Sequence, residues 1–180
     1  TLIISFAITS NLNSQTTVFD VISGSPNHSS LAAAINTANL TGALQDVNGT
    51  FTVFAPDNNA FDNLALELGT NISGLLALPN LSDILLYHVL DISVDAASVT
   101  NGLIAQPLNS ANTIKLTKTS TGNVYANHSM VNAADLQADN GVVHSIDKVI
   151  LSDETVVDIA LDNGFTTLAT AVITAELLPA

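Results

Sequence analysis

The side chains able to carry acid–base or metal chemistry in this chain are four histidines and 16 carboxylates, because cysteine is absent. The histidines are His28, His88, His128 and His144. They lack the spacing of four residues that places a metal-binding pair on one helical face, and no nucleophile motif accompanies them. Without cysteine there are no disulfides, thiolate ligands or thiol catalysis. We therefore expect no catalytic residue, no metal and no cofactor.

His144 lies in the alternation Val142-His144-Ile146, on an apolar face. A histidine in that setting is more often a core residue with both ring nitrogens hydrogen-bonded than a ligand. We expect His144 to be buried, with the hydroxyl of Thr52 as its partner. His88 follows an apolar helical pattern and carries the same expectation.

An alternative gives these histidines a chemical role. If an exposed cleft joined His88 or His144 to Asp135, the chain would be a small-molecule or glycan-processing domain with the histidines as acid/base groups. A closed, dry core around the two rings would instead favour a binding module without catalysis.

Carboxylates at alternate positions, Asp91 and Asp95 with Ser93 between them, begin like a calcium loop. Ala96 stands where that loop needs glycine, and Gly102 stands where it needs the bidentate glutamate. The segment is therefore predicted to form solvated turns, with weak surface calcium binding left open by the overall charge.

The charge balance is strongly acidic. The basic side chains are Lys115, Lys118 and Lys148, there is no arginine, and the formal net charge is −13. Such a surface cannot neutralise a phosphate backbone or dock on an anionic membrane, so nucleic acid and acidic lipid are poor partners, and we expect no nucleic-acid partner. With 47% hydrophobic residues, the chain is long enough to bury a sizeable core.

The start of the chain is apolar over Leu2 to Ile8. This run is far too short to span a bilayer, and it passes into a polar stretch as the end of a signal peptide does. Residues 1–16 are interpreted as a signal-peptide remnant or an N-terminal arm. We expect no transmembrane segment and a secreted or cell-surface protein.

Helices are predicted first and strands later. Thr17 is the expected N-cap of a first helix, Ser29 or Ser30 of a second, and Asn80 begins a later one. From about Leu103 onward the pattern alternates as strands do, and the last strand is expected to run from Val142 towards Leu151.

Between the second predicted helix and the helix that begins at Asn80, residues 51–56 alternate as a strand covered on both faces. Pro56 ends this strand, and the carboxylate of Asp57 is a good cap for the helix that follows. The helix is expected to bury Phe61, Leu64 and Leu68 and to close at Gly69.

Three segments together resemble the signature of a fasciclin-like domain, over roughly Thr17 to Leu151. Asp57 stands where threonine is usual in that family, and Asn59 stands where an acid is common. The residues that carry the resemblance are Thr52, Val53, Phe54, Ala55, Pro56, Asn58 and Phe61 in the first segment, Tyr87 and His88 in the second, and Gly141, Val142, His144 and Ile146 in the third.

The resemblance implies an α+β domain over 17–152, a wedge-like β-sandwich with helices packed along it. It implies a non-enzymatic extracellular adhesion or matrix module with protein or polysaccharide partners. In animal matrix relatives an Asp-Ile pair and the tyrosine-histidine segment are connected with integrin binding. The corresponding candidate binding residues are Asp135, Leu136, Tyr87 and His88, although the isoleucine is replaced here and no Arg-Gly-Asp sequence is present.

Residues 153–180 look like the start of a second, truncated repeat. The run 156–159, Val-Val-Asp-Ile, echoes residues 18–21, Val-Phe-Asp-Val, nearly one domain length earlier. Apolar helices without their strands need a partner, so this segment either packs on the complete domain or mediates self-association.

Glycosylation is the last candidate modification. In a secreted eukaryotic protein, Asn-x-Ser/Thr sequons are acceptors for glycans. They occur at Asn27, Asn39, Asn48, Asn71, Asn80 and Asn127.

Overall fold

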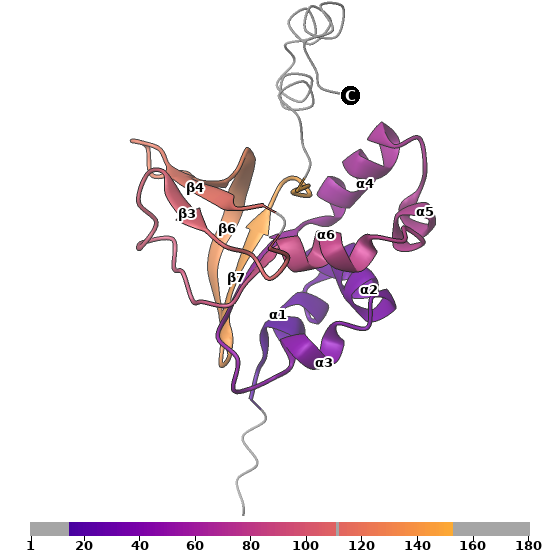
Figure 1. The fold of residues 1–180 in the computed structure, drawn as a ribbon, viewed down its shortest axis with the longest axis horizontal. Helices are drawn as coiled ribbons and strands as arrows, with labels where there is room; N and C mark the ends of the chain where they lie inside the picture. Colours follow the sequence, from indigo (N-terminus) through magenta and orange to yellow (C-terminus); the bar gives the residue numbers. More distant parts are fainter. Residues whose placement is uncertain (1–14, 111, 153–180) are drawn as a thin grey trace, which may run out of the picture.

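A computed structural model describes residues 15–110 and 112–152. Within them the helices precede most of the strands, as the sequence predicts, and they lie together on one side of the molecule (Figure 1). The helical elements are α1 (Val18–Ser23), the 3₁₀ turn η1 (Pro26–His28), α2 (Ser29–Thr37), α3 (Thr41–Leu44), α4 (Asn58–Glu67), α5 (Ile72–Leu76) and α6 (Leu81–Tyr87).

The strands form one curled, seven-stranded sheet in the order β2-β1-β7-β6-β5-β4-β3. Every neighbouring pair is antiparallel except β1 and β7, which run parallel. The strands are β1 (Phe51–Pro56), β2 (Val89–Leu90), β3 (Leu103–Ala105), β4 (Ile114–Lys118), β5 (Val124–Ala126), β6 (Ser129–Ala138) and β7 (Gly141–Ile146).

Strands β1 and β7 lie between two hydrophobic cores. All six residues of β1 are buried, which confirms the expectation of a strand covered on both faces. Val53 points into the core on the helical side, whereas Phe54 points into the core on the other side. Alternate side chains of one strand thus serve both cores, because successive residues of a strand face opposite ways.

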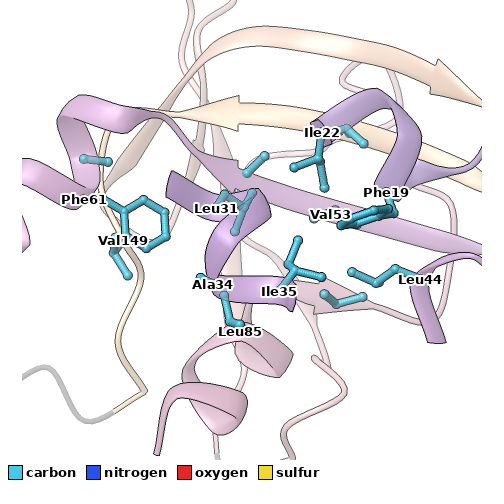
Figure 2. Close-up of a cluster of buried hydrophobic side chains, with 14 of the residues drawn as sticks. Phe19, Ile22, Leu31, Ala34, Ile35, Leu44, Val53, Phe61, Leu85 and Val149 are labelled. Carbon is cyan, nitrogen blue, oxygen red and sulfur yellow. The ribbon is translucent and has the colours of Figure 1, made fainter. Parts of the chain in front are cut away.

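The core on the helical side fills the space between the helices and β1 (Figure 2). Helix α1 begins at the predicted cap, since the Thr17 hydroxyl accepts from the Asp20 N–H at 3.3 Å and the Asp20 carboxylate accepts from the Thr17 N–H at 2.8 Å. Labelled side chains of this core include Phe19, Ile22, Leu31, Ala34, Ile35, Leu44, Val53, Phe61, Leu85 and Val149.

The second core lies within the curl of the sheet. Strand β6 makes that curl possible, because it pairs with β5 at its start and with β7 along its length. Its register against β7 shifts between Val131 and Ala133 and again between Ala133 and Leu136, and Asp135 has a φ of 58°. Irregularities of this kind bend a strand and increase its twist.

Three local expectations are wrong. Leu68 lies outside the buried face of α4 and is 53% exposed, because the helix ends at Glu67 and Leu68 is its C-cap. Strand β7 ends at Ile146 instead of continuing towards Leu151. Helix α2 begins at Ser29, its N-cap position is His28, and neither Ser29 nor Ser30 caps it. Gly69, by contrast, has the expected left-handed φ of 62° after α4.

Gly141 permits the close approach of β7 to β1. Its φ is 148°, and a Cβ at this position would lie 2.0 Å from the carbonyl oxygen of Phe51.

We expect Gly141→Ala to lower the free energy of unfolding by about 3 kcal/mol or more, because strain and a backbone clash add. Gly42→Ala in α3, where a Cβ meets nothing within 4 Å, is the control and should change stability by less than about 1 kcal/mol. Urea unfolding of both variants measures this, and equal midpoints would contradict it.

Candidate functional site

The first family motif, residues 52–61, fixes neighbouring segments by side-chain hydrogen bonds. Thr52 is fully buried in β1. Its hydroxyl donates to the Ile92 carbonyl at 2.6 Å and accepts from the Val94 N–H at 2.9 Å. A strand residue thereby holds the irregular segment that follows β2.

Asp57 and Asn58, further along the same segment, cap two different helices. Asp57 accepts from the Ala60 N–H at 2.9 Å, which caps α4 as predicted. Asn58 accepts from the Ser30 N–H at 3.0 Å and donates to the Pro26 carbonyl at 3.0 Å. Asn58 therefore supplies to α2 the cap that its own N-terminal residues do not provide.

His144 is buried and hydrogen-bonded, as predicted, but its partners are different. It is 3% exposed. Its Nε2 donates to the Val94 carbonyl at 2.8 Å, and its Nδ1 accepts from the Asp135 N–H at 3.2 Å. The ring stacks on Phe54 with centroids 5.8 Å apart. Thr52 is not a partner of His144, because its hydroxyl is already used by the backbone of Ile92 and Val94.

The Asp135 carboxylate lies near the His144 ring, but the ring is not accessible to a substrate. The Asp135 carboxylate lies 4.0 Å from His144 Nδ1 and accepts from the Ala96 N–H at 2.8 Å. Its side chain is 40% exposed, whereas that of His144 is 4% exposed. Both ring nitrogens of His144 already bond to backbone groups, so the ring has no site left for a substrate proton. Leu136, the neighbour of Asp135, packs partly buried against the core on the helical side.

Tyr87 and His88 are each 2% exposed. The Tyr87 hydroxyl donates to the Thr113 carbonyl at 3.0 Å. His88 bonds through Nδ1 to the Ile84 carbonyl and through Nε2 to the Ile150 N–H, both at 2.8 Å. Burial lowers the pKa of His88 to about 4, against the smaller opposing effect of the bond to Ile84. Among the four candidate binding residues, Asp135 is therefore the one that presents its side chain to solvent.

His28 joins the turn η1 to strand β7. Its Nδ1 lies 2.8 Å from the Ser25 hydroxyl and its Nε2 lies 2.9 Å from the Ser145 hydroxyl. Burial, the largest cause, lowers the pKa of His28, although the Asp57 charge acts in the opposite direction. The three histidines His28, His88 and His144 thus have separate sets of partners, and the structure does not assemble them into one site.

Sequence reasoning missed the role of Asn140. This residue is 2% exposed and precedes β7. Its side-chain oxygen accepts from the Val18 N–H at 2.8 Å, and its amide donates to the carbonyls of Leu44 and Asp46, both at 2.9 Å. The Asn-Gly pair before a predicted strand was the available signal, but it equally describes an ordinary turn.

The sequon asparagines differ in accessibility. Asn27, Asn39, Asn48, Asn71 and Asn80 are exposed. Asn127 is partly buried, and its side-chain oxygen accepts from the Lys115 N–H at 2.9 Å. Asn127 is thus the least accessible of the six to a glycosylating enzyme.

Within residues 15–110 and 112–152, no three acidic or histidine side chains lie close enough to hold a metal ion. No helix in the same ranges has the length and hydropathy needed to cross a membrane. The residues 1–14 of the expected N-terminal segment and the whole expected second repeat, 153–180, lie outside the described part of the chain.

The fold and the three motifs define a fasciclin domain. The sequence model of the fasciclin domain family matches residues 26–152, and the chain belongs to this family. It is 42% identical over 143 residues to "Protein sll1483" of Synechocystis, with 77% of this chain and 75% of that protein covered.

Animal proteins are also similar. The chain is 41% identical over 136 residues to the transforming growth factor-beta-induced protein ig-h3 of Sus scrofa and 31% identical over 138 residues to human periostin. These alignments cover 74% and 77% of this chain but only 19% and 16% of the two relatives.

A solved structure shares the fold. It is a FAS1 domain pair from the insect cell adhesion molecule fasciclin I, with a TM-score of 0.64 and 19% sequence identity. The likeness covers 76% of this chain and 51% of the solved one. The α+β fasciclin-like fold expected from the sequence is therefore confirmed.

Asn58 and Asn59 provide a matched pair for testing the motif. We expect Asn58→Ala to lower the free energy of unfolding by about 2 kcal/mol, because α2 loses its cap and Pro26 loses a donor. Asn59→Ala, at an exposed neighbouring position, should change stability by less than about 0.5 kcal/mol. Chemical denaturation of both variants measures the difference. Equal losses would show that Asn58 is not a structural cap.

The buried His88 predicts a dependence of stability on pH. Its folded pKa of about 4 lies below the ordinary value of 6.5, so the unfolded chain binds the proton more tightly. This contribution is complete above pH 6.5, and about 3 kcal/mol is lost as the pH falls to 4. His88→Gln removes this titration. The stability difference between wild type and the variant should therefore shrink on acidification, and a constant difference between pH 7 and 4 would contradict it.

Proposed function

We propose that this fasciclin domain is a non-enzymatic extracellular adhesion or matrix module, secreted or at the cell surface, which binds a protein or polysaccharide partner. The observation that carries the proposal is the closed environment of His144 beside Asp135. Both ring nitrogens bond to the backbone, and the side chain is 4% exposed. An acid–base mechanism that uses His144 needs an open position on its ring for substrate, which the two backbone bonds leave it without.

The family supports the same assignment. The structural neighbour is described as a cell adhesion molecule, and its fold is shared over most of this chain. The motif residues Thr52, Asp57 and Asn58 are used in internal hydrogen bonds. Partner binding is therefore assigned to the exposed surface outside the motifs, where the chain is free to vary without loss of the fold.

Asp135 is the candidate centre of that surface. It is exposed on the bent part of β6, and the exposed Gln137 two residues further donates to the Asp95 carboxylate at 3.3 Å. With a net charge of −13, the chain favours a partner that carries basic groups, or a polar polysaccharide bridged by divalent cations.

A binding screen tests the proposal. The purified full chain is applied to immobilised glycans, to extracellular matrix proteins and to itself, with and without calcium. We expect saturable binding to at least one protein or polysaccharide, without turnover of any glycan. Release of a cleaved or modified glycan that disappears in His144→Gln would overturn the non-enzymatic assignment.

A charge variant locates the binding surface. Asp135→Asn keeps an oxygen for the Ala96 N–H and tolerates the left-handed backbone, but it removes the negative charge. We expect it to weaken binding about fivefold, the usual effect of losing one charge at an interface rim. The control is Asp62→Asn on the exposed face of α4. Surface plasmon resonance compares them, and equal affinities of the two variants would remove Asp135 from the interface.

A further inference from the structure

Two surface hollows adjoin where the described part of the chain ends. One, of about 350 Å³, is lined by α4 residues together with Lys148, Val149 and Leu151. The other, of about 540 Å³, lies between the end of α4 and the start of α6 and includes Leu151 and Ser152. Leu64 and Leu151 line both hollows. We call the two hollows together the α4–α6 groove.

The groove exposes apolar side chains that the fold leaves uncovered. Leu66 is 77% exposed and lines the first hollow, and Leu68 is 53% exposed and lines the second. Partly buried Leu78 and Ile84 continue the apolar wall. Covering such a strip removes apolar surface from water, which is favourable by roughly 25 cal/mol per Å². Polar side chains line the groove beside these apolar ones, among them Asn63, Glu67 and Lys148 in the first hollow and Asn80, Asp83 and Asn109 in the second. A concave strip of this mixed kind fits an amphipathic helix or extended segment that turns its apolar face inward.

The chain continues from Ser152, at the edge of the groove, into the mainly apolar segment 156–161. Three residues separate Ser152 from Val156, so Val156 lies within about 14 Å of Ser152 even when the chain is fully extended. Residues 156–161 read Val-Val-Asp-Ile-Ala-Leu. A short tether raises the effective concentration of such a segment at the groove to the order of millimolar, which no free partner matches at ordinary levels.

The pattern of this segment matches one that is buried elsewhere in the domain. Thr155 and Asp158 have the spacing of Thr17 and Asp20, the capping box of α1. In α1 the residues that follow the cap, Val18, Phe19 and Ile22, are all buried. The corresponding positions 156, 157 and 160 are Val, Val and Ala, which supply a similar apolar face.

We propose that residues 153–180 dock into the α4–α6 groove of the same molecule, and that apolar side chains of 156–161 cover Leu66 and Leu68. The occupant of the groove is therefore the chain's own continuation. The proposal concerns an intramolecular contact and is independent of the adhesion partner.

Hydrogen exchange of the full chain tests the docking. Amides of 156–161 should exchange at least about tenfold more slowly than the free peptide, and Leu66→Asp combined with Leu68→Asp should abolish this protection. The amide of Val143 in β7 reports that the domain stays folded. Ile104→Asp, a 56% exposed position on β3, is the matched control and should leave the protection unchanged. Figure 1 shows β3 on the opposite side of the molecule from α4.

Cross-linking identifies which molecule supplies the segment. Because the chain lacks cysteine, a pair introduced as Leu68→Cys and Val157→Cys gives unambiguous products with a short bis-maleimide. We expect a cross-link within the monomer, and none above background for Ile104→Cys with Val157→Cys. A cross-linked dimer as the main product would overturn the proposal in favour of a second copy. Absence of both cross-link and protection would overturn docking altogether.

Discussion

The parallel pairing of β1 with β7 is the constraint on which the rest of the domain depends. These strands are about 90 positions apart in the chain, and Phe51 pairs with Gly141 at one end and Pro56 with Ile146 at the other. Both faces of the pair are buried, with the helices on one side and the curled strands on the other. Closing so long a loop costs conformational entropy, and burial of apolar side chains in the two cores must offset that cost.

Buried polar side chains fix how the other segments lie against this pair. Asn140 holds α1 and the end of α3, Asn58 holds α2, and Thr52 with His144 holds the backbone around Val94. Each of these groups is costly to leave unbonded inside a protein, so each permits one arrangement of its neighbours. The bonds to the backbone of Val94 and Asp135 occupy both ring nitrogens of His144, whose side chain is 4% exposed.

Much of the fold was predictable because it depends on residues that are close together in the chain. The two-sided burial of β1, the caps at Thr17 and Asp57 and the order of helices before strands follow from periodicity and capping chemistry. The site was less predictable. Burial of His144 followed from its apolar neighbours, but its partners Val94 and Asp135 did not, because their approach depends on the bend of β6.

The sequence by itself therefore determined the order of helices and strands, the caps at Thr17 and Asp57, the family and the absence of cysteine chemistry, since these depend on residue types and short spacings. The tertiary structure alone decided that Asn140 and Asn58 bond to the ends of distant helices, that Tyr87 is withdrawn from the surface, and that Leu68 is exposed beside a groove. The physical reason is that hydrogen-bond partners and solvent exposure are set by segments far apart in the chain, and short-range patterns carry no record of which segments meet.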